Sequence, residues 1–125
     1  MLIRLVLRAW IGLLVFDVAR RLGFARLHAL VRRCRVAHRR SPNAHSVEQI
    51  IWAVDEACVW YVTRAACLQR SVVATWLLRG HGVDAELVIG YRALPFESHA
   101  WVEVDGAVVN DRPQYKHVFA TLERL

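Results

Sequence analysis

The chain has 125 residues, of which 56% are hydrophobic and 22% are charged. This length favours one compact domain and excludes a multidomain enzyme with a cofactor-binding fold of its own. Charge is uneven, because residues 1–40 hold ten Arg and one acidic residue, whereas residues 41–125 hold seven basic and ten acidic residues. A basic first third joined to a mildly acidic remainder indicates an anionic partner or surface for the first third, and argues against a chain-wide nucleic-acid binder.

Cysteine usage and the apolar N-terminal segment bear on the compartment. Three cysteines leave at least one thiol unpaired, so a disulfide scaffold is not expected and a reducing, cytoplasmic environment fits best. The longest apolar run near the start covers residues 9–16, eight residues against the roughly 20 that a helical membrane span needs. No small-residue cleavage site follows it, so we expect this segment to remain in the mature protein.

Apolar residues at helical spacing predict four helices, at residues 2–19, 24–39, about 47–62 and 67 to about 79. Gly23, Pro42 and Gly80 separate or end them. Ser46 and Gln49 form a capping-box pattern before the third helix. The residues expected to face inward are Leu2, Leu5, Val6, Ala9, Leu13 and Phe16; Leu27, Leu30, Val31 and Cys34; Ile50, Ile51, Val54, Ala57, Cys58 and Tyr61; and Leu68, Val72, Val73, Trp76 and Leu77. The first helix is expected to be amphipathic.

The hydrophobic period changes to two from residue 85 onward, which predicts strands at 85–90 and 99–104. Asp105-Gly106 marks a tight hairpin turn, and residues 107–111 are the predicted returning strand. Helices followed by an antiparallel sheet define an α+β fold. We expect a single domain over 1–125, with a basic helical part at 1–45 and the candidate chemistry in 46–125.

Cys67 opens the fourth predicted helix, and this position suits a reactive thiol. A cysteine attacks as its thiolate, and the unpaired N–H groups and dipole at a helix N-terminus favour negative charge. Cys34 and Cys58 lie on apolar stripes inside predicted helices, where a thiol behaves as a small, inert hydrophobe. Cys67 is therefore the candidate nucleophile.

His99 and Asp111 supply the other two groups that a cysteine nucleophile needs. The imidazole takes the thiol proton, and a carboxylate on its other nitrogen holds the ring orientation and stabilises the imidazolium. Each residue alone has a structural explanation, His99 as a strand histidine and Asp111 as a turn residue. The three together, a helix-start Cys and then His and Asp on a hairpin, favour catalysis.

The triad requires that the hairpin bring Asp111 to the same face of the sheet as His99. A two-residue turn at 105–106 would pair Ala100 with Asp111 and send the Asp111 side chain to the opposite face from His99. A three-residue turn over 104–106 would pair His99 with Asp111 on one face. We therefore predict the three-residue bulged turn, or an equivalent one-residue bulge, and a hydrogen bond between Asp111 and a ring nitrogen of His99.

At this level of detail the catalytic half resembles the transglutaminase-like superfamily of papain-type cysteine enzymes, and within it the lasso-peptide maturation proteases. The segments that carry the resemblance are Cys67-Leu-Gln-Arg-Ser71, Leu77-Leu-Arg-Gly-His-Gly-Val83, Leu87-Val-Ile-Gly-Tyr-Arg92, Pro95-Phe-Glu-Ser-His-Ala-Trp-Val-Glu-Val104 and Val109-Asn-Asp111. The resemblance implies a papain/transglutaminase-like catalytic core in which Cys67 is the nucleophile, His99 the general base and Asp111 its orienting acid. It also implies a leader peptidase that cuts a ribosomally made lasso precursor.

The resemblance further implies partners. Lasso precursors are bound through their leader by a small recognition domain, and residues 1–45 are too short to be that domain. A separate leader-recognition protein and an ATP-dependent macrolactam cyclase are therefore the expected partners.

Two other classes of function stay open. The same acyl-enzyme would pass its acyl group to an amine in an acyl-transfer enzyme of the transglutaminase or N-acetyltransferase kind, and a non-catalytic scaffold would only bind the precursor. A zinc site built from Cys67, His99, Asp111 and His81 has suitable ligand types but lacks a short Cys/His pair spacing. We expect no metal and no other cofactor.

Several features outside the triad have two explanations each. Trp52 and Trp60 either pack between helices or, as the resemblance implies, donate to an oxyanion. Arg70 and Arg92 either form solvated or structural ion pairs, with Glu97 and Glu103 as partners, or bind leader carboxylates. The basic first third covers the sheet, docks a partner protein or contacts a membrane surface peripherally; nucleic acid is not an expected partner, because the aromatic residues do not alternate with the Arg residues.

Overall fold

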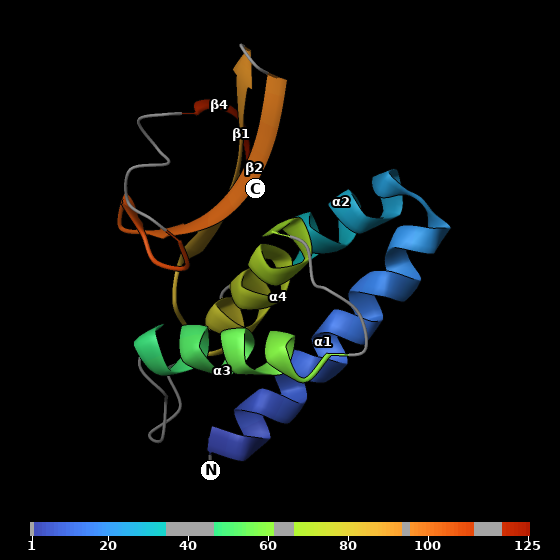
Figure 1. Ribbon diagram of the computed structural model, residues 1–125, viewed down its shortest axis with the longest axis vertical. Coiled ribbons are helices and arrows are strands. Elements are labelled where there is room, and N and C mark those ends of the chain that lie inside the picture. Colours follow the sequence, from blue (N-terminus) through green and yellow to red (C-terminus); the bar gives the residue numbers. More distant parts are fainter. Residues whose placement is uncertain (1, 35–46, 62–66, 94–95, 112–118) are drawn as a thin grey trace.

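Helices precede strands along the chain, which confirms the α+β class. The computed structural model describes residues 2–34, 47–61, 67–93, 96–111 and 119–125. The elements are α1 (Leu2–Leu22), α2 (Phe24–Arg33), α3 (Val47–Val59), α4 (Cys67–Gly80), β1 (Ala85–Ala93), β2 (Phe96–Val104), β3 (Ala107–Val108) and β4 (Ala120–Arg124). The strands form one antiparallel sheet in the order β3-β2-β1-β4. Figure 1 shows the helices gathered at one end of the molecule and the sheet at the other.

The main core lies where α1, α3 and α4 meet, and it extends to the sheet. Its buried side chains include Leu5, Leu13, Ile50, Val54, Ala57, Val73, Leu77, Leu78, Ala85 and Val102. Each large aliphatic side chain buried in this way stabilises the fold by about 1.5–3 kcal/mol. Because the core joins α4 to the sheet, it fixes the start of α4 relative to β2.

The packing of α1 and α2 differs from the predicted faces. Leu5, Leu13 and Phe16 are buried as expected, but Ile3 is 70% exposed, so α1 is apolar on two sides and not amphipathic. Leu30 of α2, predicted to face inward, is 52% exposed. These helices contain more aliphatic positions than one packing stripe uses, and the contacts with α3 and α4 decide which of them are buried.

The helix boundaries agree with the sequence except at the end of α2. That helix ends at Arg33, and Cys34 has an extended backbone with φ −72° and ψ 106°. The predicted continuation through residue 39 is therefore wrong at Cys34, and residues 35–39 lie outside the described residues, as does Ser46 of the capping-box pattern.

The sheet is longer than the sequence predicts. β1 and β2 pair from Ala85 with Val104 to Ala93 with Phe96, so both strands extend beyond their predicted ends. β4 pairs with β1 at the sheet edge. β4 was not predicted: residues 120–124 are a short segment, and most of them are exposed.

Arg79 connects three parts of the molecule from a buried position. Its guanidinium donates hydrogen bonds to the carbonyl oxygens of Val31 and Cys34 at the end of α2, of Ala85 in β1 and of Leu125 at the C-terminal residue, over distances of 2.6–3.1 Å. A buried charged donor with several carbonyl acceptors contributes much more than one neutral hydrogen bond does. Arg79 therefore fixes α2 and the last strand against α4.

Candidate active site

Cys67 is the first residue of α4, as predicted, and it is partly exposed. Its side chain packs against a small cluster formed by Val31, Leu87 and Ala100. Ala100 follows His99 in β2, so the thiol lies beside the strand that carries the candidate base. The helix N-terminus supplies backbone N–H groups and a positive dipole end at this point.

His99 lies in the middle of β2, opposite Gly90 of β1. Its ring stacks on Phe119 at a centroid distance of 5.6 Å and near Trp101 at 6.3 Å. Gly90 permits this arrangement, because a Cβ there would come within 2.6 Å of the Trp101 ring. The histidine side chain is 17% exposed and its orientation is fixed by aromatic packing.

Asp111 contacts two residues of the site through a single oxygen. Its Oδ2 lies 2.9 Å from His99 Nε2 and 3.1 Å from Arg70 Nη2. The carboxylate side chain is 15% exposed. The predicted hydrogen bond between Asp111 and His99 is thus present in the structure.

The hairpin turn that precedes Asp111 differs from the predicted one. Residues 105 and 106 form a two-residue turn, with φ of 52° at Asp105 and 79° at Gly106, and Val104 pairs with Ala107. The predicted three-residue turn is wrong. The expectation that a two-residue turn would separate Asp111 from His99 is also wrong, because regular pairing ends before Asp111.

Asn110 is the reason that pairing ends. Val109 still donates its N–H to the Val102 carbonyl, but the Val102 N–H donates to Asn110 Oδ1 at 2.8 Å, where a regular ladder would use a backbone carbonyl. Asn110 Nδ2 in turn donates to Ser71 Oγ at 3.0 Å. The chain leaves β3 at this side chain, so strand alternation no longer decides where Asp111 points. Sequence reasoning did not assign this role; an Asn in a strand pattern was the available signal.

Arg70 links the His99–Asp111 pair to α4 and α3. It lies one turn after Cys67, and besides its contact with Asp111 it approaches Asp55 of α3 at 3.8 Å. Burial raises the pKa of Asp55, while the charge of Arg70 lowers it and that of Asp111 raises it further. Arg70 thus forms ion pairs, but with Asp111 and Asp55, whereas the expected partners Glu97 and Glu103 pair with Arg92 and Arg124.

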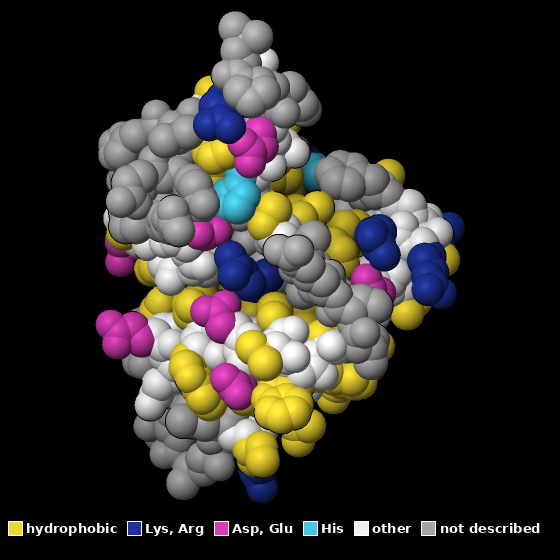
Figure 2. Space-filling model, viewed as in Figure 1, with side chains coloured by type: hydrophobic (Ala, Val, Ile, Leu, Met, Phe, Trp, Pro, Cys, Tyr) yellow, Lys and Arg dark blue, Asp and Glu magenta, His cyan; other side chains and the backbone are white. Residues whose placement is uncertain are grey.

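Figure 2 shows one face of this region, where a histidine, basic side chains and acidic side chains gather between the sheet and α3. Arg92, the other arginine considered, forms an ion pair with Glu97 and lies over the Phe119 ring at 5.7 Å. It therefore supports the packing beside His99 from the sheet.

The other two thiols hold their protons more tightly than an ordinary cysteine. Burial raises the pKa of Cys34 and of Cys58, and nearby Arg79 and Arg70 respectively only partly oppose this. Both cysteines are half-buried. A smaller thiolate fraction at neutral pH makes them poor nucleophiles.

His81 is not brought to Cys67, and the two candidate Trp residues are exposed. His81 lies at the other end of α4, roughly 20 Å along the axis, where its Nδ1 contacts the Leu77 carbonyl. Within the described part of the chain no group of three or more His, Cys, Asp and Glu side chains could hold a metal ion. Trp60 is exposed and donates its indole N–H to Glu56, and Trp52 is 48% exposed, so neither fills the helix-packing role considered for it.

Comparison with known proteins agrees with this fold. The family model for the Transglutaminase-like superfamily matches residues 12–124, so the chain belongs to this superfamily. Among curated proteins, the microcin J25-processing protein McjB of Escherichia coli is 38% identical over 64 residues. That match covers 51% of this chain and 31% of McjB, about a third of the relative's length. No solved structure matches the chain.

Proposed function

We propose that this protein is a cysteine peptidase that removes the leader from a ribosomally made lasso-peptide precursor. The observation that carries the proposal is the His99–Asp111 hydrogen bond beside a helix that begins at Cys67. The kind of substrate is inferred from the relative, since McjB processes microcin J25, which is a lasso peptide.

In the proposed reaction, His99 removes the thiol proton of Cys67. Because Nε2–H donates to Asp111, Nδ1 is the nitrogen that would accept this proton. The thiolate attacks the carbonyl carbon of the scissile peptide bond, and the backbone N–H of Cys67 is the proposed donor to the oxyanion. The C–N bond then breaks, and the leaving amine takes the proton from the imidazolium.

Hydrolysis of the thioester completes the cycle. His99 removes a proton from water, the resulting hydroxide attacks the thioester carbonyl, and the leader carboxylate leaves while the thiol of Cys67 is restored. Asp111 remains ionised throughout and stabilises the imidazolium in both steps. In this proposal residues 46–125 carry the reaction, which takes place in the cytoplasm, and a separate leader-recognition protein and an ATP-dependent cyclase complete the system.

The test is cleavage of a lasso precursor by the full chain, measured by mass spectrometry with and without a leader-recognition protein. Cys67→Ala should abolish leader release and retain precursor binding, whereas Cys34→Ala and Cys58→Ala, the matched controls, should cleave. Adding the recognition protein should lower KM strongly and raise kcat less. Cleavage of the precursor by the Cys67→Ala variant would overturn the proposal. So would a wild-type chain that cleaves unrelated peptides in a Cys67-dependent way but does not cleave the precursor.

Acyl transfer is the second candidate, and membership in the Transglutaminase-like superfamily favours it. It uses the same thioester, which an amine captures in place of water. Adding a primary amine during turnover and measuring amide against carboxylate product separates the two reactions. A non-catalytic scaffold would instead show no selectively fast alkylation of Cys67 among the three thiols at neutral pH.

A further inference from the structure

The outward surface of α1 and α2 has an unusual composition. Every exposed residue of these two helices, among the side chains described, is either a small or branched aliphatic residue or an arginine. They are Ile3, Arg4, Leu7, Arg8, Ile11, Leu14, Val15, Val18, Arg20, Arg21 and Leu22 in α1, and Ala25, Arg26, Leu30, Arg32 and Arg33 in α2. We call this set the outer face. It includes no acidic residue and no neutral hydrogen-bonding side chain.

The aliphatic residues of α1 form a continuous stripe. Ile3, Leu7, Ile11, Val18 and Leu22 recur at helical spacing, and each is between 52% and 70% exposed. The stripe follows the helix for roughly 30 Å, opposite the side that packs on α3 and α4. Isolated exposed aliphatic residues are common on proteins, but a contiguous stripe of this length marks an interaction surface.

The charges beside the stripe have one sign. α1 and α2 contain a single acidic residue, Asp17, which is partly buried and contacts Tyr61 and Arg20. Arg4, Arg8 and Arg21 form no ion pair within the described residues. As far as the described part of the chain shows, Arg4, Arg8 and Arg21 thus present unpaired guanidinium groups next to aliphatic side chains, whereas Arg20 and Arg32 pair with Asp17 and Glu123.

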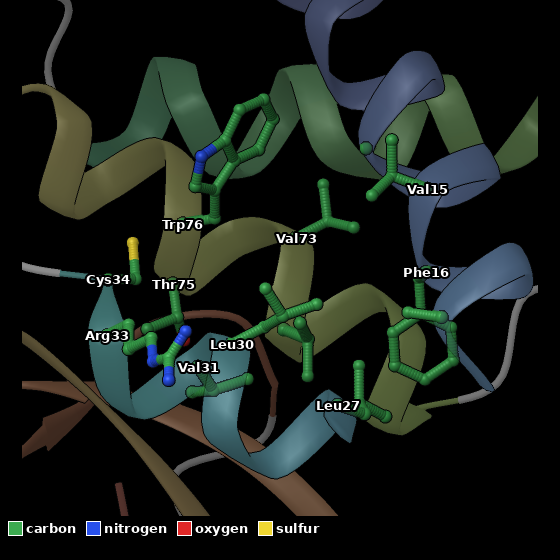
Figure 3. A pocket seen from close by; sticks show the side chains of 13 residues that line it. Val15, Phe16, Leu27, Leu30, Val31, Arg33, Cys34, Val73, Thr75 and Trp76 are labelled. Atoms are coloured by element: carbon green, nitrogen blue, oxygen red, sulfur yellow. The ribbon is translucent and has the colours of Figure 1, made fainter. Parts of the chain in front are cut away.

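A groove of about 350 Å³ opens beside the outer face, between α1, α2 and α4. Figure 3 shows its aliphatic and aromatic lining, which includes Phe16, Leu27, Val73 and Trp76. Val15 lines the groove and also belongs to the outer face, so the apolar surface is continuous from the stripe into the groove.

We propose that the outer face binds the surface of a lipid bilayer that contains anionic headgroups. Aliphatic side chains would enter the region between headgroups and acyl chains, while the arginines contact lipid phosphates. A protein partner is a poorer match, because protein interfaces carry a polar rim of mixed hydrogen-bonding groups, which the outer face lacks. The proposal is independent of the peptidase activity.

The proposed mode is peripheral. No helix in the described part of the chain has the length and apolar composition of a bilayer-spanning segment. α1 would therefore lie in the plane of the membrane surface.

Vesicle flotation of the full chain tests the proposal. The wild-type chain should float with vesicles of phosphatidylcholine and phosphatidylglycerol, bind phosphatidylcholine alone far less, and dissociate at high salt. Arg4→Gln/Arg8→Gln should lower the partition coefficient about 30-fold, since each Arg near an anionic surface contributes about 1 kcal/mol and about 1.4 kcal/mol is a factor of ten. Leu7→Asn/Ile11→Asn/Val18→Asn should lower it at least tenfold.

The matched control is Val59→Asn/Leu122→Asn, which changes aliphatic residues that are equally exposed but lie outside the outer face. It should bind vesicles as the wild type does. Circular dichroism should show that all variants fold, since every substituted side chain is exposed. Failure of the wild type to bind anionic vesicles would overturn the proposal. So would full binding by the triple variant, or self-association of the wild type that the triple variant abolishes without any vesicle binding.

Discussion

Asp111 is the single residue on which the candidate active site depends most, because one of its oxygens contacts both His99 and Arg70. Asn at this position keeps the size and an acceptor but removes the charge. We expect Asp111→Asn to fold normally and to reduce kcat for leader release by about 10³-fold, less than Cys67→Ala does, because the imidazolium loses its charged partner.

The matched control for this prediction is Asp105→Asn, in the exposed hairpin turn. Asp105 has a positive φ, which Asn tolerates well, and the substitution Asp105→Asn removes the same charge as Asp111→Asn does. It should leave kcat unchanged. Equal kcat for wild type and Asp111→Asn, measured with saturating precursor, would remove Asp111 from the mechanism.

The thiols provide a second prediction at the scale of residues. Burial raises the pKa of Cys34 and of Cys58, so their alkylation by iodoacetamide in the folded protein should accelerate only at more alkaline pH than in the denatured chain. Peptide mapping by mass spectrometry measures each site separately.

The same shifts predict a pH dependence of stability. Folding raises the pKa of Cys34 and of Cys58, so the protonated thiols contribute to the free energy of unfolding. This contribution is complete below the pKa of the unfolded thiols and is lost as pH rises through the pKa values of the folded protein. The free energy of unfolding should therefore decline at alkaline pH, and less so in Cys34→Ala/Cys58→Ala. Alkylation of Cys58 at neutral pH as fast as in the denatured chain would contradict this account.

Among the structural elements, the β2–β3 hairpin is the one whose geometry a single side chain controls. Asn110 is buried and makes hydrogen bonds to the backbone of Val102 and to Ser71. Asn110→Ala leaves the buried Val102 N–H without its acceptor, whereas Ser71 Oγ keeps its hydrogen bond to the Ala100 carbonyl. We expect a loss of about 2 kcal/mol in the free energy of unfolding by urea.

The Asn110→Ala substitution should affect kcat more clearly than it affects the free energy of unfolding. Loss of the Asn110 contacts lets residues 109–111 move, so kcat should fall even at temperatures where the variant is fully folded. Ser71→Ala, combined with Asn110→Ala, should cost less than the sum of the two changes, because they share one hydrogen bond. Strict additivity would mean that Asn110 does not act through Ser71.

For the whole molecule, Arg79 has the largest predicted effect on stability. It is 8% exposed and donates to carbonyls of α2, of β1 and of the C-terminal residue. Arg79→Leu leaves these carbonyls without their charged donor, and we expect unfolding in urea to show a loss of about 3 kcal/mol. The control Arg33→Leu, at an exposed position of α2, should change stability by less than about 0.5 kcal/mol.

Interactions between residues that are close together in the sequence determined several features of this protein. The start of a helix at Cys67 and the shared strand face of His99 and Trp101 depend on neighbours within a few residues, and the sequence predicted both. The position of the turn at Asp105-Gly106 was predicted in the same way, but its two-residue form was not. The order of motifs along the chain indicated the superfamily, and the family match agrees with it.

Tertiary contacts decided the rest. Which side of α1 is buried depends on α3 and α4, since both of its sides are aliphatic. The position of Asp111 depends on Asn110 contacting Ser71, 39 residues earlier in the chain, and β4 forms only because β1 offers an edge. Periodicity and turn type describe the backbone over a few residues, whereas a hydrogen bond or a packed face between distant segments exists only after the chain has folded.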